Sequence, residues 1–386
     1  MNARIARQHS ATPQRQRGAA LLLLLAVVVV AASYTLLKRL NHTPSALDRA
    51  ADTAAILGEA KAALIGYALK SSNRPGELPC PDSNNSGTSI PTPCTGNVTF
   101  RFPWKKLGLP DLRDSSGERL WYVVDPAFTG NTAINSETVP ALTIDGGTTR
   151  YAAILIAPGK SLQGQTRSGG QQNNIQRYLE ADNANNDAFF VTTASGDFND
   201  QLLGITRDEL IQAVERRVLK EVANSLNLYK KANSYFPNPA AIGTPPPGIP
   251  ACEVSAGTVP VNIGATCTSQ ANWGGAALPS WFVGNGWDQM IWYVVADDCD
   301  QSSTNACGSV PAARLNVNAP SGNRNDVDAL LIAGGPPLPG LSQNNRSPIT
   351  DDNDLLDSFE NRNDDLTFEV LPLDTSSNDQ LRVIAP

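Results

Sequence analysis

Histidine is almost absent from this chain of 386 residues. The two histidines, His9 and His42, flank an N-terminal apolar run, so no later residue can supply the histidine of a Ser-His-Asp triad or of a common zinc site. Aromatic residues are also scarce, at 6%, and charged residues make up only 17%. Apolar residues nevertheless reach 41%, which is enough for the cores of two or three compact domains and excludes wholesale disorder.

Positive charge is scarce outside the N-terminus. Residues 1–50 contain seven of the 30 Lys and Arg residues and one of the 37 acids, Asp48, which leaves 23 bases against 36 acids in the remainder. The body of the chain therefore carries a net charge of −13. A surface this acidic repels phosphate backbones, so we expect no nucleic-acid partner.

The N-terminal apolar run covers residues 19–37 and contains no charged residue. At about 1.5 Å per residue, this length is just enough to cross about 30 Å of hydrocarbon, so the run predicts a transmembrane helix. Four arginines precede it, which predicts a cytoplasmic N-terminus and an exported body. Three interpretations fit: a signal peptide cut after residues 30–32, an uncleaved signal anchor, or a short basic leader that is removed while the apolar run is retained.

An amphipathic helix is predicted directly after this run. Pro44 interrupts the chain, and Ser45 with Asp48 forms a capping-box pattern. We expect about seven turns that end near residues 71–73. The helical period is carried by Leu47, Ala51, Ala54, Leu57, Leu64 and Leu69.

Several short motifs occur in an order that is typical of one family. Residues 15–18 (RQRG) directly precede the apolar run, and residues 58–68 (GEAKAALIGYA) lead to residues 78–82 (LPCPD). The motifs PW, LGL and RLWY follow at residues 103–104, 107–109 and 119–122. From residue 14 to about residue 206 the chain therefore resembles type IV pilins and type II secretion pseudopilins, in particular a group of large pilin-like proteins.

The resemblance implies processing and partners. A prepilin peptidase would cleave between Gly18 and Ala19, and Ala19 would then be N-methylated. The protein would pass once through the inner membrane, with its N-terminus cytoplasmic and its body periplasmic, or extracellular in an assembled filament. Its partners would be other pilins or pseudopilins. Pilins of this class usually carry a glutamate four residues after the mature N-terminus, whereas this sequence has Leu23.

The chain also contains an internal repeat. The segments 120–124 and 291–295, 154–159 and 330–335, and 199–202 and 378–381 are similar pairs at offsets of 171, 176 and 179. Three matches in the same order at nearly one offset indicate a duplication in which only the loops differ in length.

Each copy is expected to begin with a helix and to continue with strands. The second helix is predicted to start at Thr206, with Glu209 completing a capping box. Its apolar stripe consists of Leu210, Val214, Val218, Val222, Leu226 and Tyr229. Strands are predicted at residues 119–124, 151–157 and 188–193 in the first copy, and at 290–295, 327–333, 366–371 and 381–384 in the second.

Helix first and strands afterwards, without helical crossovers, predicts an α+β fold with antiparallel sheets. The expected architecture is a long N-terminal membrane-spanning helix packed on a small antiparallel sheet, as in pilins, followed by a second helix-plus-sheet unit in tandem. The predicted organisation is a leader (1–18), a transmembrane helix (19–37), a first unit (38–205) and a second unit (206–386).

The six cysteines all lie after the apolar run, and six allow fifteen disulfide connectivities. The repeat reduces the number of plausible connectivities. Each copy has one pair of cysteines in the equivalent loop, and the two cysteines that remain lie close together in sequence. No CxxC motif is present, which together with export favours disulfides over a zinc site. The expected pairs are Cys80–Cys94, Cys252–Cys267 and Cys299–Cys307.

Two segments rich in Asp and Asn are candidates for a Ca²⁺ site, since clustered oxygen ligands suit that ion and some pseudopilins bind calcium in a late loop. Solvated turns are the alternative, because neither segment has the spacing of an EF-hand. The candidate ligands are Glu180, Asp182 and Asp187 in the first segment and Asp351, Asp352 and Asp354 in the second.

Nothing in the sequence marks a catalytic centre. Residues 154–161 end like a phosphate-binding loop, but the first glycine of that motif is missing, so a strand and a turn are expected. Four aromatic residues of the second copy suit either a sugar-stacking surface or a core, and a core is the more common environment. They are Trp273, Trp281, Phe282 and Trp287.

These features predict a structural subunit rather than an enzyme. The leading hypothesis is a minor pilin or pseudopilin of a type IV pilus or type II secretion system. A membrane-tethered binding protein or adhesin and an anchored hydrolase are the alternatives. Because Leu23 cannot neutralise a neighbouring subunit's terminal amine, and because two units would crowd a helical shaft, we expect a position at the filament tip or in the initiation complex.

Overall fold

A computed structural model describes residues 17–40, 45–240, 255–261, 273–338 and 349–384, together with 242 and 346. Within these ranges it omits residues 95, 97, 131, 132, 302, 305 and 364. The chain forms two compact units, residues 1–51 and 52–386. The second unit contains both copies of the sequence repeat.

Helix α1 (Arg17–Leu40) is the main element of the smaller unit, residues 1–51. In the described part of the chain, no helix combines the length and the apolar character needed to cross a membrane. The predictions of a transmembrane helix at 19–37, of the membrane-spanning fold class and of a single-pass inner-membrane localisation are therefore wrong.

Helix α2 (Ala46–Ala68) confirms the predicted cap. The Ser45 N–H donates to the Asp48 carboxylate at 2.9 Å, and the Asp48 N–H donates to the Ser45 hydroxyl at 3.1 Å. The helix ends earlier than predicted, and its first turns are exposed, with Leu47 at 82% exposure. Its buried face consists of Thr53, Leu57, Ala60, Leu64 and Ala68.

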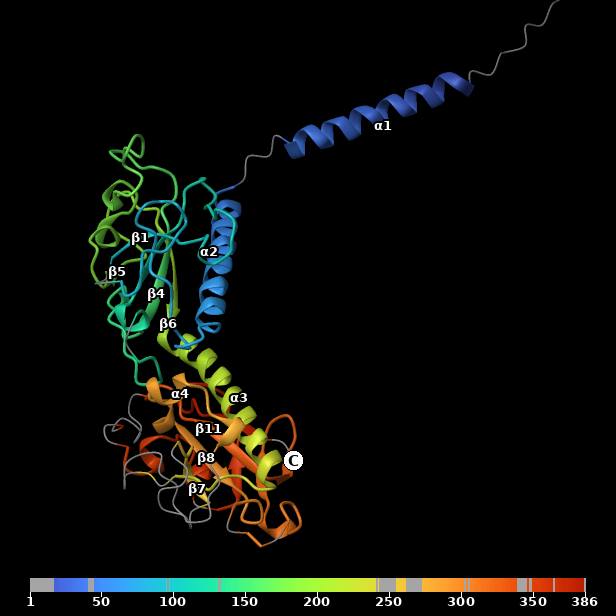
Figure 1. Cartoon of the computed structure of the whole chain (residues 1–386). Coiled ribbons are helices and arrows are strands. Elements are labelled where there is room, and N and C mark those ends of the chain that lie inside the picture. The colour runs from blue at the N-terminus through green and yellow to red at the C-terminus, as the bar shows by residue number, and fades with distance from the viewer. Residues whose placement is uncertain are drawn as a thin grey trace, which may run out of the picture. The chain divides into compact units, whose positions relative to one another are not determined.

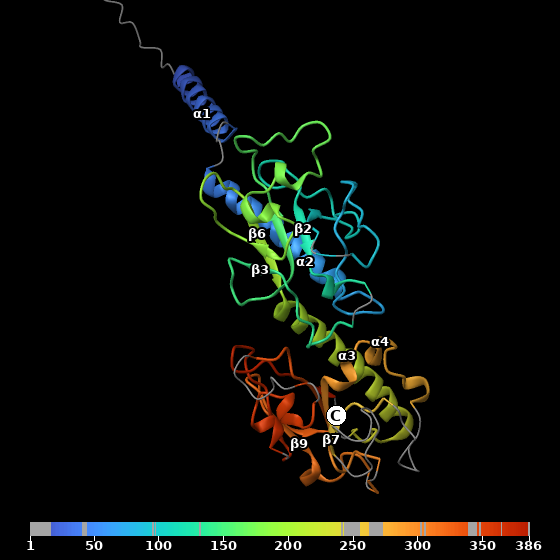
Figure 2. The same cartoon turned by 90° about the vertical axis from the view of Figure 1, so that its left-hand side faces the viewer.

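The first sheet has the order β1-β2-β4-β6, and all neighbouring strands are antiparallel. Its strands are β1 (Phe100–Arg101), β2 (Trp121–Val124), β4 (Tyr151–Ala157) and β6 (Gln201–Thr206). Figures 1 and 2 show α2 running along this sheet. Leu57 and Leu64 of α2 share one apolar core with Tyr122 and Leu155 of the sheet.

The second sheet repeats this arrangement. It has the antiparallel order β7-β8-β11-β13, with strands β7 (Ala256–Thr258), β8 (Ile291–Val295), β11 (Ala329–Ala333) and β13 (Gln380–Ile384). Helix α3 (Arg207–Asn233) packs on it, and Figure 1 shows α3 beside β8 and β11. The Glu209 N–H donates to the Thr206 hydroxyl at 3.1 Å, and every residue of the predicted apolar stripe is buried.

Equivalent strands of the two sheets carry equivalent side-chain contacts. The Tyr122 hydroxyl donates to the Pro79 carbonyl at 3.0 Å, and the Tyr293 hydroxyl donates to the Pro237 carbonyl at 3.1 Å. The predicted boundary between residues 205 and 206 stays a prediction, because α3 contributes to both cores. Its first turn packs in the core of the first sheet, and later residues from Val214 onward pack in that of the second.

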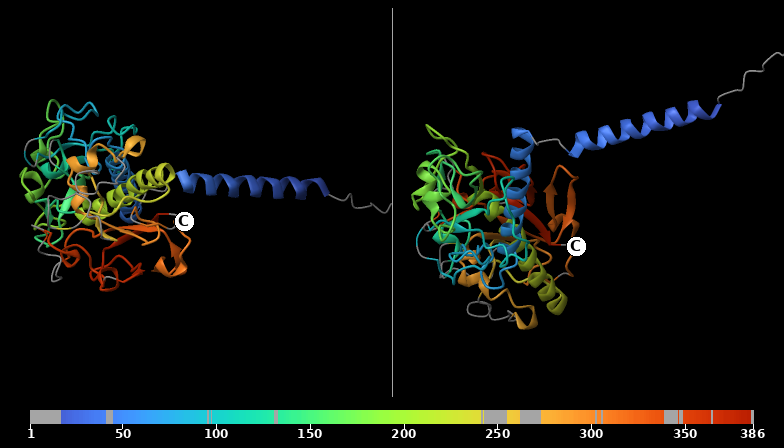
Figure 3. Two further views of the ribbon diagram at one scale, coloured as in Figure 1. Left: turned by 60° about the horizontal axis from the view of Figure 1, so that its bottom comes forward. Right: turned by 90° about the horizontal axis from the view of Figure 1, so that it is seen from above.

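The remaining strands form two small sheets. Strands β3 (Thr143–Ile144) and β5 (Phe189–Phe190) pair in parallel. Strand β9 (Leu315–Asn318) pairs antiparallel with β10 (Arg324–Val327) and parallel with β12 (Thr367–Glu369). The short helix α4 (Trp281–Gly284) precedes β8. Long loops connect these elements, as Figure 3 shows from two directions.

Candidate functional site

The predicted cleavage site lies at the start of α1, where Gly18 and Ala19 belong to the first turn. The leader up to residue 16 lies outside the described residues. Further along α1, the large apolar side chains are exposed, from 55% for Val29 to 67% for Val30. Ala26, Val27, Val30, Ala31 and Tyr34 lie together on one open apolar face of this helix. An apolar helix of this kind is suited to packing against another apolar surface.

Two of the three predicted disulfides are present. Cys80–Cys94 closes a loop before β1, with a Cα–Cα distance of 5.7 Å, and Cys299–Cys307 closes a loop after β8, with a Cα–Cα distance of 4.2 Å. Cys252 and Cys267 lie outside the described residues. The two pairings were predicted on different grounds, Cys80–Cys94 from the repeat and Cys299–Cys307 as the remaining local pair, and both are confirmed.

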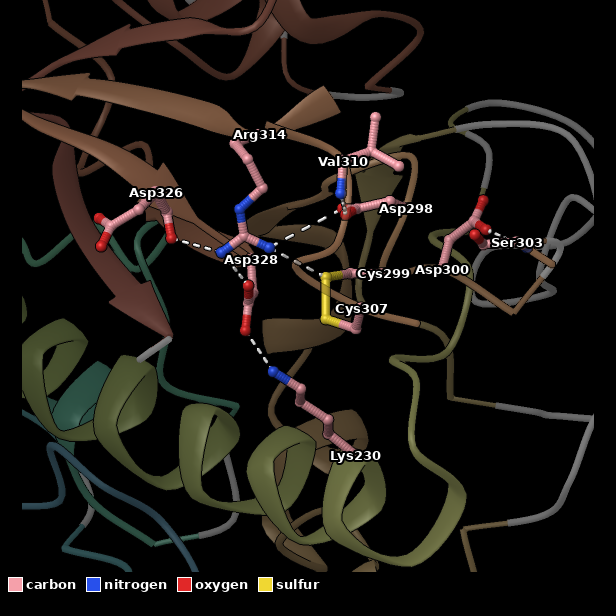
Figure 4. The surroundings of a disulfide bond; sticks show 10 residues. All are labelled: Lys230, Asp298, Cys299, Asp300, Ser303, Cys307, Val310, Arg314, Asp326 and Asp328. Carbon is pink, nitrogen blue, oxygen red and sulfur yellow. Dashed lines mark hydrogen bonds and ion pairs between the residues drawn. A yellow bond between two sulfur atoms is a disulfide. The ribbon is translucent and has the colours of Figure 1, made fainter. Parts of the chain in front are cut away.

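A buried ionic cluster surrounds the second disulfide (Figure 4). Lys230 of α3 and Arg314 both form ion pairs with the buried carboxylate of Asp328. Arg314 also lies 3.8 Å from a carboxylate oxygen of Asp298, and its Nη1 donates to Cys299 Sγ at 3.3 Å. Two cations and two carboxylates balance one another, so the cluster is electrically neutral and joins α3 to the loops around β8 and β11.

This cluster does not fit a metal ion. The ligand atoms of Cys299, Cys307 and Asp328 lie within 4.8 Å of one another, and no other such group of three occurs among the described residues. The two sulfur atoms are bonded to each other, however, and the carboxylate is held by two cations. The geometry is that of a structural cross-link.

The first group of calcium candidates is divided among local hydrogen bonds. The Glu180 carboxylate accepts the N–H groups of Asn199 and Asp200 at 3.1 and 3.2 Å. The carboxylate of Asp182 accepts from an amide three residues later, and that of Asp187 accepts the N–H of residue 189 at 2.8 Å. Asp182 and Asp187 thus stabilise their own turns, whereas Glu180 holds the segment that leads into β6. The three carboxylates are not brought together as one group of metal ligands among the described residues.

The second group behaves similarly. Asp351 and Asp354 form a capping box around a single 3-10 turn, and Asp354 also accepts two hydrogen bonds from Thr350, both at 2.7 Å. These hydrogen bonds lower the pKa of Asp354, although partial burial opposes the shift. The Asp352 carboxylate accepts a hydrogen bond from a side-chain amide at 3.3 Å. Calcium binding stays a prediction for both groups.

The repeated Asn-Asp-Gln-Leu motif has a structural role that the sequence pattern did not reveal. The Asn199 amide donates to the Lys160 carbonyl at 2.8 Å, and the equivalent Asn378 donates to the Pro336 carbonyl at 2.6 Å. The following aspartates, Asp200 and Asp379, are buried, and burial raises the pKa of each, to about 7 for Asp379. Both copies thus use the motif to attach a long loop to the beginning of the last strand.

Buried polar side chains connect the segment 133–139 to the second sheet. Glu215 of α3 is fully buried, accepting from the Ser136 hydroxyl at 2.8 Å and from the Gln380 amide at 2.5 Å, and burial raises its pKa to about 7. Arg346 pairs with Glu137 at 3.2 Å and donates to four backbone carbonyls. This contact joins parts of the chain that lie far apart in sequence.

The aromatic residues considered for sugar stacking are mostly core residues. Trp281, Phe282 and Trp287 are buried in the core of the second sheet, and Trp273 packs against it. The Trp273 ring lies edge-on to Tyr229, with 5.4 Å between the ring centroids. The core interpretation is therefore confirmed for the three buried residues.

The sequence analysis missed a cleft of about 570 Å³ beside the first disulfide loop. Its rim includes Lys105 and Lys106, two adjacent lysines in an otherwise acidic body. That local contrast in charge was the signal available in the sequence.

No family model, no curated protein and no solved structure matches this chain.

Proposed function

We propose that this chain is a pilin-like structural subunit, a minor pilin or pseudopilin of a type IV pilus or type II secretion system. The observation that carries the proposal is the exposed apolar surface of α1. Val27, Val28 and Val30 are between 57% and 67% exposed, and Leu24 and Leu25 are exposed to a similar extent. A contiguous apolar surface of this kind favours association, and the occupant we propose is the corresponding helix of neighbouring subunits.

The gain from such packing is substantial. Each large aliphatic side chain that becomes fully buried contributes about 1.5 to 3 kcal/mol. Five such side chains on one helix would contribute about 7 to 15 kcal/mol, which is of the same order as the entropic cost of association that they must offset. The order of sequence motifs from the RQRG segment to residues 119–122 supports the same proposal.

We further place the subunit at the filament tip or in the initiating complex. Two helix-on-sheet units in tandem make a bulky subunit, and a terminal position has no neighbour beyond it to be crowded. The residue four positions after Ala19 is Leu23 rather than glutamate. This side chain cannot neutralise the terminal amine of a neighbour, which again favours a terminal position over a repeated position along a shaft.

Processing would be carried out by a partner enzyme. A prepilin peptidase would remove residues 1–18 and leave Ala19 as the mature N-terminus, which would then be N-methylated. Removal of the basic leader would leave the apolar part of α1 at the N-terminal end of the mature chain. The work of the protein in this proposal is assembly, and no catalytic step is assigned to it.

Substitution on α1 tests the proposal. We expect the double variant Val27→Asp and Val30→Asp to remain folded but to fail to co-purify with filaments, because buried carboxylates in a helical bundle are unfavourable. The matched control is Val139→Asp, which changes a valine that is 62% exposed and lies outside α1. Normal incorporation of the double variant would contradict the proposal.

Position is tested separately by immunogold labelling of sheared filaments. We expect sparse labels at filament ends and reduced filament assembly after deletion of the gene. Regular labelling along the shaft would contradict the terminal position, and unchanged assembly and secretion after deletion would contradict the structural role itself.

A further inference from the structure

The cleft near the first disulfide is formed by three segments of the chain. One is the end of α2 with the loop after it, which contributes Tyr67, Arg74, Glu77 and Pro79. The second is the loop 88–92, and the third is the turn that carries Lys105 and Lys106. Its volume of about 570 Å³ lies within the range of small-molecule sites.

The walls of this cleft are held in place. The Cys80–Cys94 disulfide closes the loop that contains residues 88–92. The Gly87 carbonyl accepts the N–H groups of Lys105, at 2.8 Å, and of Lys106, at 3.3 Å, so this loop and the lysine turn are joined. Gly87 has φ +82° and lies directly against the Trp104 ring, where a side chain would collide. The site is therefore largely preformed, which reduces the entropic cost of binding.

The cleft carries a local excess of positive charge. Arg74 pairs with Glu77 at 3.1 Å, so these two charges cancel. Lys105 and Lys106 are exposed, and among the described residues neither ammonium lies within 4.0 Å of a carboxylate. The Lys106 ammonium lies 5.7 Å from the centre of the Tyr67 ring, and that of Lys105 lies 5.0 Å from the Trp104 ring. Two positive charges thus face solvent on a chain whose body is strongly acidic.

We propose that this cleft binds a compact acidic sugar, one or two hexuronic acid residues in length. The two ammonium groups suit the carboxylates of such a sugar. The hydroxyls of Thr88, Ser89 and Thr92 suit its hydroxyl groups, and the rings of Tyr67 and Pro91 suit its apolar face. An acidic sugar unites these three lining chemistries in one ligand.

The charge of the surroundings limits the size of the ligand. A long polyanion would extend from the cleft over the rest of the body, whose net charge of −13 would repel it. A monosaccharide or disaccharide avoids this repulsion. The inference does not depend on filament assembly, because every residue in it belongs to the first helix-on-sheet unit.

Isothermal titration of the full chain with digalacturonic acid tests the proposal. We expect saturable binding that weakens as salt is added, and about a tenfold or greater loss in the double variant Lys105→Gln and Lys106→Gln. The matched control is Lys160→Gln with Lys231→Gln, which removes two exposed lysines elsewhere. The control should bind as the unmodified protein does.

Three further probes make the outcome decisive. The corresponding neutral galactose disaccharide should bind at least tenfold more weakly, and inorganic phosphate and succinate should bind weakly. Equal binding of the neutral sugar would show that the lysines do not select charge and would overturn the proposal. Equal binding of phosphate or succinate would reduce the site to one for simple anions and would also overturn it. An equal loss of affinity in the Lys105/Lys106 variant and in the control variant would also overturn the proposal.

Discussion

Replacing Glu215 by glutamine should change how the stability of this protein depends on pH. Glu215 is fully buried on α3 and accepts hydrogen bonds from Ser136 and Gln380. Burial, the largest cause, raises its pKa from 4.5 to about 7, although the two hydrogen bonds and Arg346 oppose the shift. A buried carboxyl with a raised pKa is neutral in the folded state over a range in which it is ionised in the unfolded state.

The sign and size of the effect follow from linkage. The contribution of Glu215 to the free energy of unfolding is fully present below pH 4.5 and is lost as the pH rises through about 7. A shift of this size corresponds to about 3 kcal/mol, at about 1.4 kcal/mol for each pH unit. Glutamine keeps the shape, can donate to Ser136 and accept from Gln380, and does not titrate. We therefore expect the variant to match the unmodified protein near pH 4.5 and to be more stable by about 3 kcal/mol at pH 8.5.

Urea unfolding followed by tryptophan fluorescence, at several pH values between 4.5 and 8.5, measures this difference. Other buried acids, including Asp200, titrate in both proteins, so their effects largely cancel in the comparison. The control is Glu59→Gln, which makes the same change at an exposed glutamate of α2. A difference independent of pH for the Glu215 variant, or one that favours the unmodified protein at high pH, would refute the reasoning.

Three further predictions concern packing and covalent links. Gly204→Ala should destabilise the protein by about 1 to 3 kcal/mol in urea unfolding, because the new methyl group would collide with the ring of Tyr151; a neutral effect would show that the ring moves freely. Arg346→Met should lower stability by at least about 3 kcal/mol, since four buried carbonyls lose their donor, and a loss below about 1 kcal/mol would contradict that assignment. Non-reducing peptide mapping should show Cys252 linked to Cys267, and a link from either to the first sheet's loop would contradict the duplication.

Local signals in the sequence predicted the helices of the large unit well. The caps at Ser45 and Thr206 depend on residues three positions apart, and both are present. The apolar stripe of α3 is buried along its whole length because this helix packs between two cores. The same periodicity failed at the start of α2, where Leu47 is exposed, since periodicity alone does not say where the covering sheet ends.

The antiparallel pairing of the main sheets was predicted, but not all of their strands were. Strands β4 and β11 occur almost where the hydrophobic runs indicated, and the main sheets are antiparallel as expected. Strand β6 was missed: residues 201–205 were assigned to no strand, and Thr206, predicted only as the start of the helix, is both the last residue of β6 and the cap of α3. The membrane-spanning helix was the main error, since no helix in the described part of the chain combines the length and the apolar character needed to cross a membrane.

Functional positions were harder to predict because they depend on contacts distant in sequence. The carboxylates proposed as calcium ligands, such as Glu180, are engaged by backbone N–H groups that the pattern could not place. The cleft beside Lys105 and Lys106 is assembled from three separate segments, so no single motif describes it. Cysteine pairing was predictable for the described loops because the duplication indicated Cys80–Cys94, and Cys299 and Cys307 were the remaining pair, close together in sequence.

The central claim is that this chain is processed and assembled as a pilin-like subunit. Mass spectrometry of the N-terminal peptide, from protein purified out of cells that assemble the filament, tests it most directly. The account predicts a mature chain that begins at Ala19 and carries an N-methyl group. A chain that begins at Met1 or at Ser33 would contradict it.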